Sequence, residues 1–264
     1  MDDTLRNELR RVAHLCADAA SVETRRWFRV RDLSADNKDA SDYDPVTEGD
    51  RAAEAAIRAV LAVERPDDAI LGEEEGRKPG TTGLTWVLDP IDGTRGYVAG
   101  TPTWGTLISV ADDGGPLFGI VDQPYIGERF EGGFGVASYS GPAGTRPLET
   151  SQRDTLSEAV LFTTFPELGT EAERQAFQAV RAEAKLTRYG MDCYAYALVA
   201  AGHADLVIEA GLAAYDIQAP IAVVQAAGGI VTDWEGGPVH DGGRAVAAAN
   251  AALHAAALER INSV

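Results

Sequence analysis

The chain has 264 residues, and its 41 Asp and Glu outnumber its 23 Lys and Arg, so its formal net charge is −18. This length can form one large domain or two small ones around a buried core, and the hydrophobic fraction of 45% excludes wholesale disorder. The negative charge argues against nucleic acid as the main partner, because phosphate binding needs a basic face, and it disfavours an anionic membrane surface.

The sequence shows no targeting or membrane signal. Residues 1–15 lack the charged-then-apolar pattern of a signal peptide, and no apolar run approaches the roughly 20 residues that a spanning helix needs. Two cysteines, Cys16 and Cys193, are too few for a disulfide framework. We therefore expect a cytoplasmic protein with no membrane partner.

In chain order, the sequence first predicts two helices with a loop between them. A polar stretch at 34–45, rich in Asp, Ser and Asn, predicts a mobile hairpin or loop. Thr47 and Asp50, spaced as helix cap and first-turn acid, predict the start of the second helix. The first helix, over 4–28, is predicted by an apolar stripe at helical spacing: Leu5, Leu9, Val12, Cys16 and Ala19.

Short β-type runs follow, and Gly and Pro separate them. They predict a mostly antiparallel sheet, in which the glycine-rich GGFG at 132–135 is a turn and not a nucleotide loop. The predicted strands cover 69–71, 85–89, 106–111, 117–122 and 128–136.

Beyond a Gly/Pro-rich segment at 141–147, strand-like and helix-like segments alternate to the end of the chain. Such alternation predicts a second layer of α/β type. We therefore expect an α/β (α+β) sandwich with an N-terminal α+β lobe over 1–144 and a C-terminal α/β lobe over 145–264.

The carboxylates that predict chemistry lie where apolar strands end. GEEE (72–75) follows one strand, and LDPIDGT (88–94) follows another, so that Asp89 and Asp92 flank Pro90 and Ile91. Carboxylates this close repel each other unless a cation lies between them. Hard divalent ions such as Mg²⁺ prefer oxygen ligands, and the Ile91 carbonyl offers another. An ordinary Asx-type turn is the alternative for DPIDGT alone.

Gly93 and Thr94 supply backbone N–H groups where a helix can start. Beside a bound cation, such amides form a site for a phosphate group. The segment therefore predicts a metal-assisted phosphate site, with a small-molecule phosphate ester as the partner.

These segments resemble the inositol monophosphatase superfamily of Mg²⁺-dependent phosphatases. The resemblance rests on GEE at 72–74, WVLDPIDGT at 86–94, YD at 215–216 with QAAGG at 225–229, and PVTEGD at 45–50. It covers about residues 36–250, and it implies a layered αβαβα sandwich, two or three Mg²⁺ ions per site and a homodimer.

Carried over residue by residue, the resemblance implies a role for each matching position. Glu73 and Thr94 orient the attacking water, with Asp50 supporting Thr94, and Gly93 and Thr94 hold the phosphate through backbone N–H groups together with Asp92. The cations lower the pKa of the water and stabilise the leaving alkoxide. The implied metal ligands are Glu73, Asp89, the Ile91 carbonyl, Asp92 and Asp216.

The C-terminal segment looks like the histidinol-phosphate phosphatase branch of this superfamily, on GxDCYxY at 190–196, GHxDLVxE at 202–209 and YD at 215–216. Histidinol phosphate carries an ammonium group that a polyol lacks, so carboxylates beside the substrate can pair with it. The positions implied to border the substrate are Arg188, Gly190, Asp192 and Glu209. Arg188 could contact the phosphate or one of the acids. Asp192 also opens a predicted helix, where an acid is favourable without any ligand.

The sequence thus predicts a histidinol-phosphate phosphatase, with two rivals. One is the same chemistry on inositol 1-phosphate or a related sugar phosphate, because the reacting phosphate is common to all these substrates. The other is a non-catalytic member of the superfamily that binds a metal or ligand. DGTRGY in place of DGTxNF and Tyr215 in place of Trp bear on specificity and leave the expected ligands intact.

Overall fold

The structure, a computed structural model, describes residues 1–31, 33, 35–37 and 45–264. Its first helix, α1 (Asp3–Trp27), confirms the predicted helix over 4–28. The N-cap Asp2 accepts a hydrogen bond from the Leu5 amide at 2.8 Å, which satisfies one of the free N–H groups of the first turn. The predicted stripe faces inward, with Leu9, Val12 and Cys16 fully buried.

The second helix, α2 (Glu48–Glu64), begins where the sequence predicts. Thr47 and Asp50 form a capping box, in which the Thr47 amide donates to Asp50 Oδ2 at 2.8 Å and the Thr47 hydroxyl accepts from the Gly49 amide at 3.0 Å. Before it, β1 (Ala35–Asn37) pairs antiparallel with β2 (Pro45–Thr47). The rest of the predicted 34–45 loop lies outside the described residues.

The predicted sheet forms from eight strands in the order β10-β9-β8-β7-β6-β5-β3-β4. Every neighbouring pair is antiparallel except β3 with β5, as expected for a mostly antiparallel sheet. The strands are β3 (Ala69–Gly72), β4 (Gly76–Lys78), β5 (Thr85–Asp92), β6 (Gly105–Asp112), β7 (Gly115–Gln123), β8 (Glu128–Gly133), β9 (Val136–Gly141) and β10 (Gly144–Pro147).

Two predicted strands differ from the observed ones. The run 128–136 is two strands, because Phe134 and Gly135 adopt positive φ angles of 52° and 80° and turn the chain back after β8. The run 85–89 continues to Asp92, with a shift of register against β6 between Asp89 and Asp92. Pro90 cannot donate a ladder hydrogen bond, so it lies within this irregularity, and both aspartates lie at its ends.

The second half of the chain forms a five-stranded mixed sheet in the order β12-β11-β13-β15-β14, as the alternation predicts. Its strands are β11 (Val160–Thr163), β12 (Leu186–Tyr189), β13 (Leu206–Ala213), β14 (Ile230–Thr232) and β15 (Gly242–Ala248). The helices of this half are η1 (Leu156–Glu158), α4 (Glu171–Arg181), α5 (Cys193–Ala200), α6 (Ala214–Ala226) and α7 (Ala251–Ile261), while the short α3 (Thr94–Ala99) belongs to the first half.

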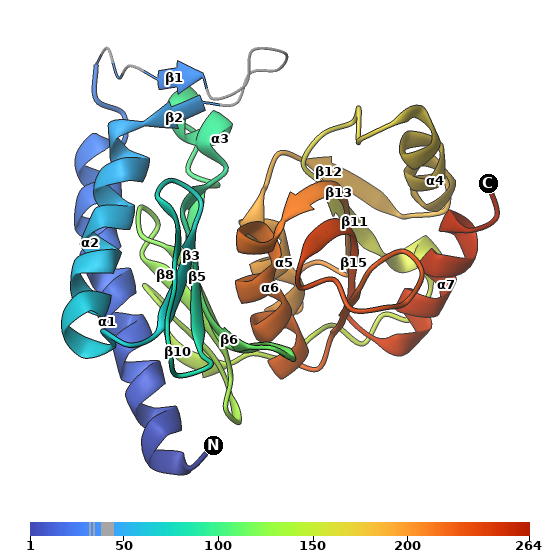
Figure 1. The fold of residues 1–264 in the computed structure, drawn as a ribbon. Coiled ribbons are helices and arrows are strands. Elements are labelled where there is room, and N and C mark those ends of the chain that lie inside the picture. The colour runs from blue at the N-terminus through green and yellow to red at the C-terminus, as the bar shows by residue number, and fades with distance from the viewer. Residues whose placement is uncertain (32, 34, 38–44) are drawn as a thin grey trace.

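These elements stack into five layers, the αβαβα sandwich that the resemblance implies (Figure 1). Helices α1 and α2 cover one face of the large sheet, α5 and α6 lie between the two sheets, and α4 and α7 cover the far face of the small sheet. Eight consecutive residues of α6, 217–224, are buried, which is the pattern of a helix enclosed on all sides. A Cβ on Gly132 of the large sheet would lie 2.5 Å from the Ala222 carbonyl oxygen, so glycine permits this close packing.

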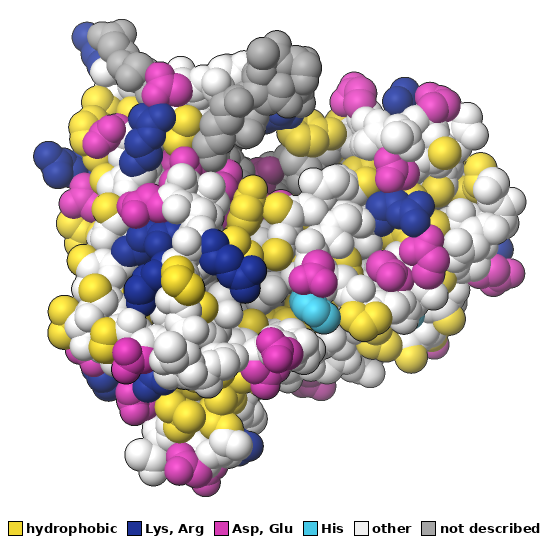
Figure 2. All heavy atoms as spheres, in the orientation of Figure 1, with side chains coloured by type: hydrophobic (Ala, Val, Ile, Leu, Met, Phe, Trp, Pro, Cys, Tyr) yellow, Lys and Arg dark blue, Asp and Glu magenta, His cyan; other side chains and the backbone are white. Residues whose placement is uncertain are grey.

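The predicted division into lobes falls within β10, which spans residues 144–147. The division at 144/145 therefore stays a prediction. Among the residues that the structure describes, no helix is long and apolar enough to cross a membrane. Acidic and basic side chains are interspersed on the face that Figure 2 shows.

Asp205, in the GHAD segment before β13, joins several parts of the second half. Its side chain is fully buried and accepts hydrogen bonds from the Ser151 hydroxyl, from the Val160 amide at 2.7 Å, and from Arg153 Nε at 2.8 Å. Burial of a carboxylate is tolerated here because each of its oxygens has donors.

We expect Asp205→Ala to lower the free energy of unfolding by on the order of 2–4 kcal/mol, because it leaves these buried donors unpaired. Urea denaturation checks this through the transition midpoint. Asp154→Asn, at a neighbouring exposed position, is the matched control and should change stability by less than about 0.5 kcal/mol. Equal midpoints for the two variants would contradict the expectation.

Candidate active site

A pocket of about 720 Å³ opens where the two halves of the chain meet. One side is lined by Glu73, which follows β3, and by residues 89 and 91–95, at the end of β5 and just after it. The other side is lined by residues 164, 165 and 167–169 after β11, by Asp192, and by residues of β13 and the start of α6. Residues from both sheets are therefore needed to close the site.

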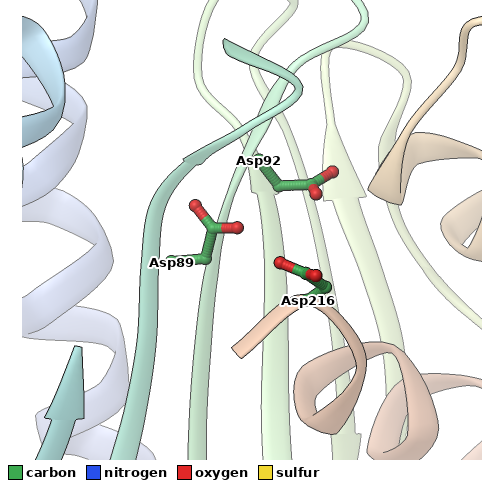
Figure 3. A group of neighbouring side chains, drawn as sticks. All are labelled: Asp89, Asp92 and Asp216. Atoms are coloured by element: carbon green, nitrogen blue, oxygen red, sulfur yellow. The ribbon is translucent and has the colours of Figure 1, made fainter. Parts of the chain in front are cut away.

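Asp89, Asp92 and Asp216 gather in this pocket, and one carboxylate oxygen of each lies within 4.8 Å of the other two. Figure 3 shows Asp89 and Asp92 at the end of β5 and Asp216 at the start of α6, with the three carboxyl groups converging. The register shift in β5 lets Asp89 and Asp92 point to the same place, although strand residues three apart would normally face opposite sides. Asp216 is brought in by the fold from 124 positions after Asp92.

The electrostatics of this cluster suit a cation. Burial, and then the negative charge of Glu73, Asp92 and Asp216, raises the pKa of Asp89 well above its ordinary value. Burial and the charges of Asp192 and Asp216 raise the pKa of Asp92 in the same direction. A divalent cation among the carboxylates would reverse these shifts, since an opposite charge favours the ionised form. The all-oxygen set fits a hard ion of the Mg²⁺ or Ca²⁺ type.

Neighbouring backbone amides hold the three carboxylates in place. Asp89 Oδ1 accepts from the Ile91 amide at 3.0 Å, and Asp216 Oδ2 accepts from the Ala213 amide at 2.7 Å. Asp92 Oδ2 accepts from the Cys193 amide at the start of α5, so the second half of the chain also orients this residue. A backbone amide thus orients the carboxylate of each of these candidate ligands before any metal binds.

Thr94 and Asp50 lie in contact at the edge of the site. The Thr94 hydroxyl lies 2.9 Å from the Ile91 carbonyl oxygen and 3.3 Å from Asp50 Oδ1. Asp50 is fully buried behind the pocket and does not line it. Gly93, at a φ of 86°, ends the strand and exposes the first amides of α3, where the resemblance places the phosphate.

Asp192 and Glu209 line the same pocket on the side of the second sheet. Asp192 precedes α5, and its side chain makes no capping hydrogen bond to that helix. A Cβ on Gly93 would lie 2.8 Å from Asp192 Oδ2, which places this carboxylate directly against the expected phosphate site. Burial raises the pKa of Asp192 to about 6, while the charge of Arg95 acts in the opposite direction.

Glu209 is held more firmly than Asp192. Its Oε1 accepts from the Thr164 amide at 2.7 Å and the Thr164 hydroxyl at 2.9 Å, and its Oε2 accepts from the Thr163 hydroxyl at 3.2 Å. Burial raises its pKa to about 7, and these hydrogen bonds oppose the shift. Glu209 lies within β13, where the register against β15 shifts between Glu209 and Leu212.

Two expected substrate residues lie outside the pocket lining. Arg188 is exposed on β12, the edge strand of the small sheet, and Gly190 follows that strand at a φ of 73°. The structure shows no contact of Arg188 with Asp192 or Glu209, so the alternative that it fixes one of these acids is wrong, while its contact with the phosphate stays a prediction. The reason is its place on the edge strand, which the linear sequence does not reveal.

The cation that the structure places in the pocket is Arg95, the one Arg or Lys among the described lining residues. Its guanidinium lies 4.9 Å from the ring centroid of Phe165, which lines the opposite side. Neither residue was predicted from the sequence to take part in the site. The only signal for Arg95 was the departure of DGTRGY from the common DGTxNF pattern.

Comparisons with known proteins agree with this geometry. Residues 5–264 match the model of the inositol monophosphatase family. The chain is 40% identical to the bifunctional phosphatase IMPL2 of Arabidopsis thaliana over 89% of this chain and 67% of that protein. It is 36% identical to a histidinol-phosphatase of Mycobacterium tuberculosis over 94% and 95% of the two chains.

Among solved structures, an inositol monophosphatase from Zymomonas mobilis superimposes with a TM-score of 0.86 at 38% identity, over 99% of this chain and all of that one. The match of the family model covers nearly the whole chain. The pocket is lined by the acidic residues on which the family resemblance rests. The chain therefore belongs to the inositol monophosphatase family and is a phosphatase.

Proposed function

We propose that this phosphatase hydrolyses L-histidinol phosphate to histidinol and phosphate, and that it uses Mg²⁺ to do so. The observation that supports this substrate is a pair of carboxylates, the half-buried Asp192 and the buried Glu209, on the pocket wall beside the expected phosphate site. An ammonium group on the substrate matches such carboxylates, because charge-assisted hydrogen bonds in a buried site are strong. The relative of M. tuberculosis is named a histidinol-phosphatase.

The expected ligands of the metal ions are Glu73, Asp89, the Ile91 carbonyl, Asp92 and Asp216. When bound, such ions supply an activated water and stabilise the charge that develops on the leaving oxygen. The chain itself would hold the phosphate at the amides of Gly93 and Thr94, at the start of α3.

Within this proposal, Asp50 sets the proton position on Thr94. The Thr94 hydroxyl has one proton and two acceptors in reach, the Ile91 carbonyl at 2.9 Å and Asp50 Oδ1 at 3.3 Å. A metal ion on the Ile91 carbonyl would compete for that oxygen, and Asp50 would then be the favoured acceptor of the Thr94 proton. The lone pairs of the Thr94 oxygen, which lines the pocket, would then be able to accept a hydrogen bond from the attacking water.

The second candidate substrate is inositol 1-phosphate. One support is the 38% identity to the inositol monophosphatase from Z. mobilis. Another is Glu209, whose carboxylate already accepts hydrogen bonds from the hydroxyl groups of Thr163 and Thr164. The cytoplasmic location, the homodimer and the absence of nucleic-acid and membrane partners remain predictions from the sequence.

The decisive experiment measures phosphate release with Mg²⁺ and compares kcat/KM for histidinol phosphate and inositol 1-phosphate. We expect at least a 100-fold preference for histidinol phosphate, which corresponds to about 2.7 kcal/mol of transition-state discrimination. Chelation of the metal with EDTA should abolish both activities, and added Mg²⁺ should restore them. Equal values for the two substrates would refute the substrate proposal, and activity in EDTA would refute the metal proposal.

A further inference from the structure

Glu54 is a fully buried carboxylate on α2 that the site described above does not include. Fully buried glutamates are rare unless they are paired. Its partners are specific: Oε2 accepts from the Glu74 amide at 2.8 Å, and Oε1 accepts from the Glu75 amide at 3.1 Å and from Arg58 Nε at 2.8 Å. Two backbone N–H groups of the turn between β3 and β4 therefore donate hydrogen bonds to this one side chain.

The residue just before those two amides is Glu73, which lines the pocket. Its own amide donates to the Leu88 carbonyl of β5 at 3.2 Å. The backbone of Glu73 is thus fixed on one side by β5 and on the other side by Glu54. The Glu73 carboxyl lies close enough to Asp89 to raise the pKa of Asp89, so a shift of this turn would move Glu73 relative to the aspartate cluster.

The neighbouring glycine shows that the structure is built around this contact. A Cβ on Gly72 would lie 2.0 Å from Glu54 Oε1, so the carboxylate occupies the space that a side chain at position 72 would take. Arg58, one turn further along α2, balances the charge of Glu54 and also donates to the Gly76 carbonyl at 2.6 Å. The turn is therefore fastened to α2 at three successive backbone positions, 74, 75 and 76.

The same helix also contacts the other group expected to orient the water. Asp50, one turn before Glu54, lies 3.3 Å from the Thr94 hydroxyl. Helix α2 thus fixes the positions of both groups. It holds Thr94 through Asp50, and it holds Glu73 through Glu54 and the turn. Small displacements of positioned groups in a catalytic site reduce rates strongly.

We propose that Glu54 is a positioning residue, which holds Glu73 in the geometry for metal binding and water orientation by anchoring the turn at 73–75 to α2. This inference rests on the proposed role of Glu73. Because Glu54 acts through the backbone, its loss should weaken metal binding and lower kcat, and should leave KM for the phosphate ester little changed.

The test compares the full-length wild type with Glu54→Gln, which keeps the size and removes the charge, and Glu54→Asp, which keeps the charge and is too short to reach the turn. Glu64→Gln, an α2 residue whose carboxylate pairs with the partly exposed Arg11, is the matched control. Mg²⁺ binding to the metal-free protein is measured by titration calorimetry, alongside kcat, KM and thermal melting.

We expect both Glu54 variants to fold and to bind Mg²⁺ about 10- to 100-fold more weakly, as is usual when a residue that orients a metal ligand is lost. The control should bind Mg²⁺ within twofold of wild type. Unchanged Mg²⁺ affinity and kcat in folded variants would overturn the inference, and so would failure of both variants to fold, since Glu54 would then be a folding residue. Weaker Mg²⁺ binding in an enzyme that prefers another phosphate ester would refute the proposed substrate and leave this inference standing.

Discussion

Asp89→Asn is expected to lower kcat for histidinol phosphate by about 1,000-fold or more at saturating Mg²⁺. The substitution keeps the shape of the side chain and the acceptor for the Ile91 amide, which lies 3.0 Å from Asp89 Oδ1. What it removes is one negative charge from the cluster with Asp92 and Asp216. A loss of about 4 kcal/mol in transition-state stabilisation, typical for failure of metal-ion catalysis, corresponds to this factor.

A stability measurement separates this effect from misfolding. Burial and neighbouring charges raise the pKa of Asp89 in the folded state, so the folded protein binds more protons than the unfolded one over the interval between the two pKa values. When no metal is bound, stability therefore decreases as pH rises through this interval.

The metal-free Asp89→Asn protein should consequently be at least as stable as wild type at pH 7, while Mg²⁺ should raise the melting temperature of wild type only. Asp112→Asn, an exposed change at the end of β6, is the control and should leave kcat within twofold. A variant that keeps more than a tenth of the wild-type kcat would show that Asp89 is not required as a ligand.

Asp192→Asn is expected to lower kcat/KM for histidinol phosphate by about 10- to 100-fold and to change the value for inositol 1-phosphate by less than threefold. Loss of a hydrogen bond between charged groups costs about 1.5–3 kcal/mol, and only the first substrate carries an ammonium group that can form it. Asparagine matches aspartate in size and shape, so the backbone at this position, with a φ of 48° and a ψ of −139°, should stay in place.

Glu167→Gln provides the comparison, because Glu167 also lines the pocket but is exposed. It should affect both substrates by less than threefold, since exposed charges are screened by water and salt. Equal losses on both substrates for Asp192→Asn would eliminate the charge-pairing argument. The pocket would then distinguish its substrates by other contacts, and Arg95 and Phe165, which line it, are the candidates.

Local structure followed closely from the sequence. The apolar stripe of α1 and the capping pair Thr47 and Asp50 of α2 depend on residues three or four positions apart, and such short-range physics is readable from the chain alone. Errors occurred where backbone conformation broke a regular pattern. The turn at Phe134 split one predicted strand, and the irregularity at Pro90 prolonged another.

The candidate site divides in the same way. Glu73, Asp89 and Asp92 lie within 20 residues of one another, so their association was predictable from two neighbouring strand ends. Asp192 was named from its motif, but only the structure shows it against Gly93 and without a capping hydrogen bond to α5. Arg188 belongs to the same segment, and its position on an edge strand keeps it out of the pocket lining.

The sequence by itself therefore determined the local elements, the acidic motif and the family resemblance, because these depend on residue types at short spacing. The family resemblance implied that Asp216 joins Asp92, as the structure shows. The tertiary structure alone decided that Arg95 meets Phe165 and that Glu54 meets the turn after Glu73. Glu54 illustrates the physical reason. In an Ala-rich helix it looks like any solvated acid, and only the approach of the β3–β4 turn, with N–H groups that need an acceptor, turns it into a buried anchor.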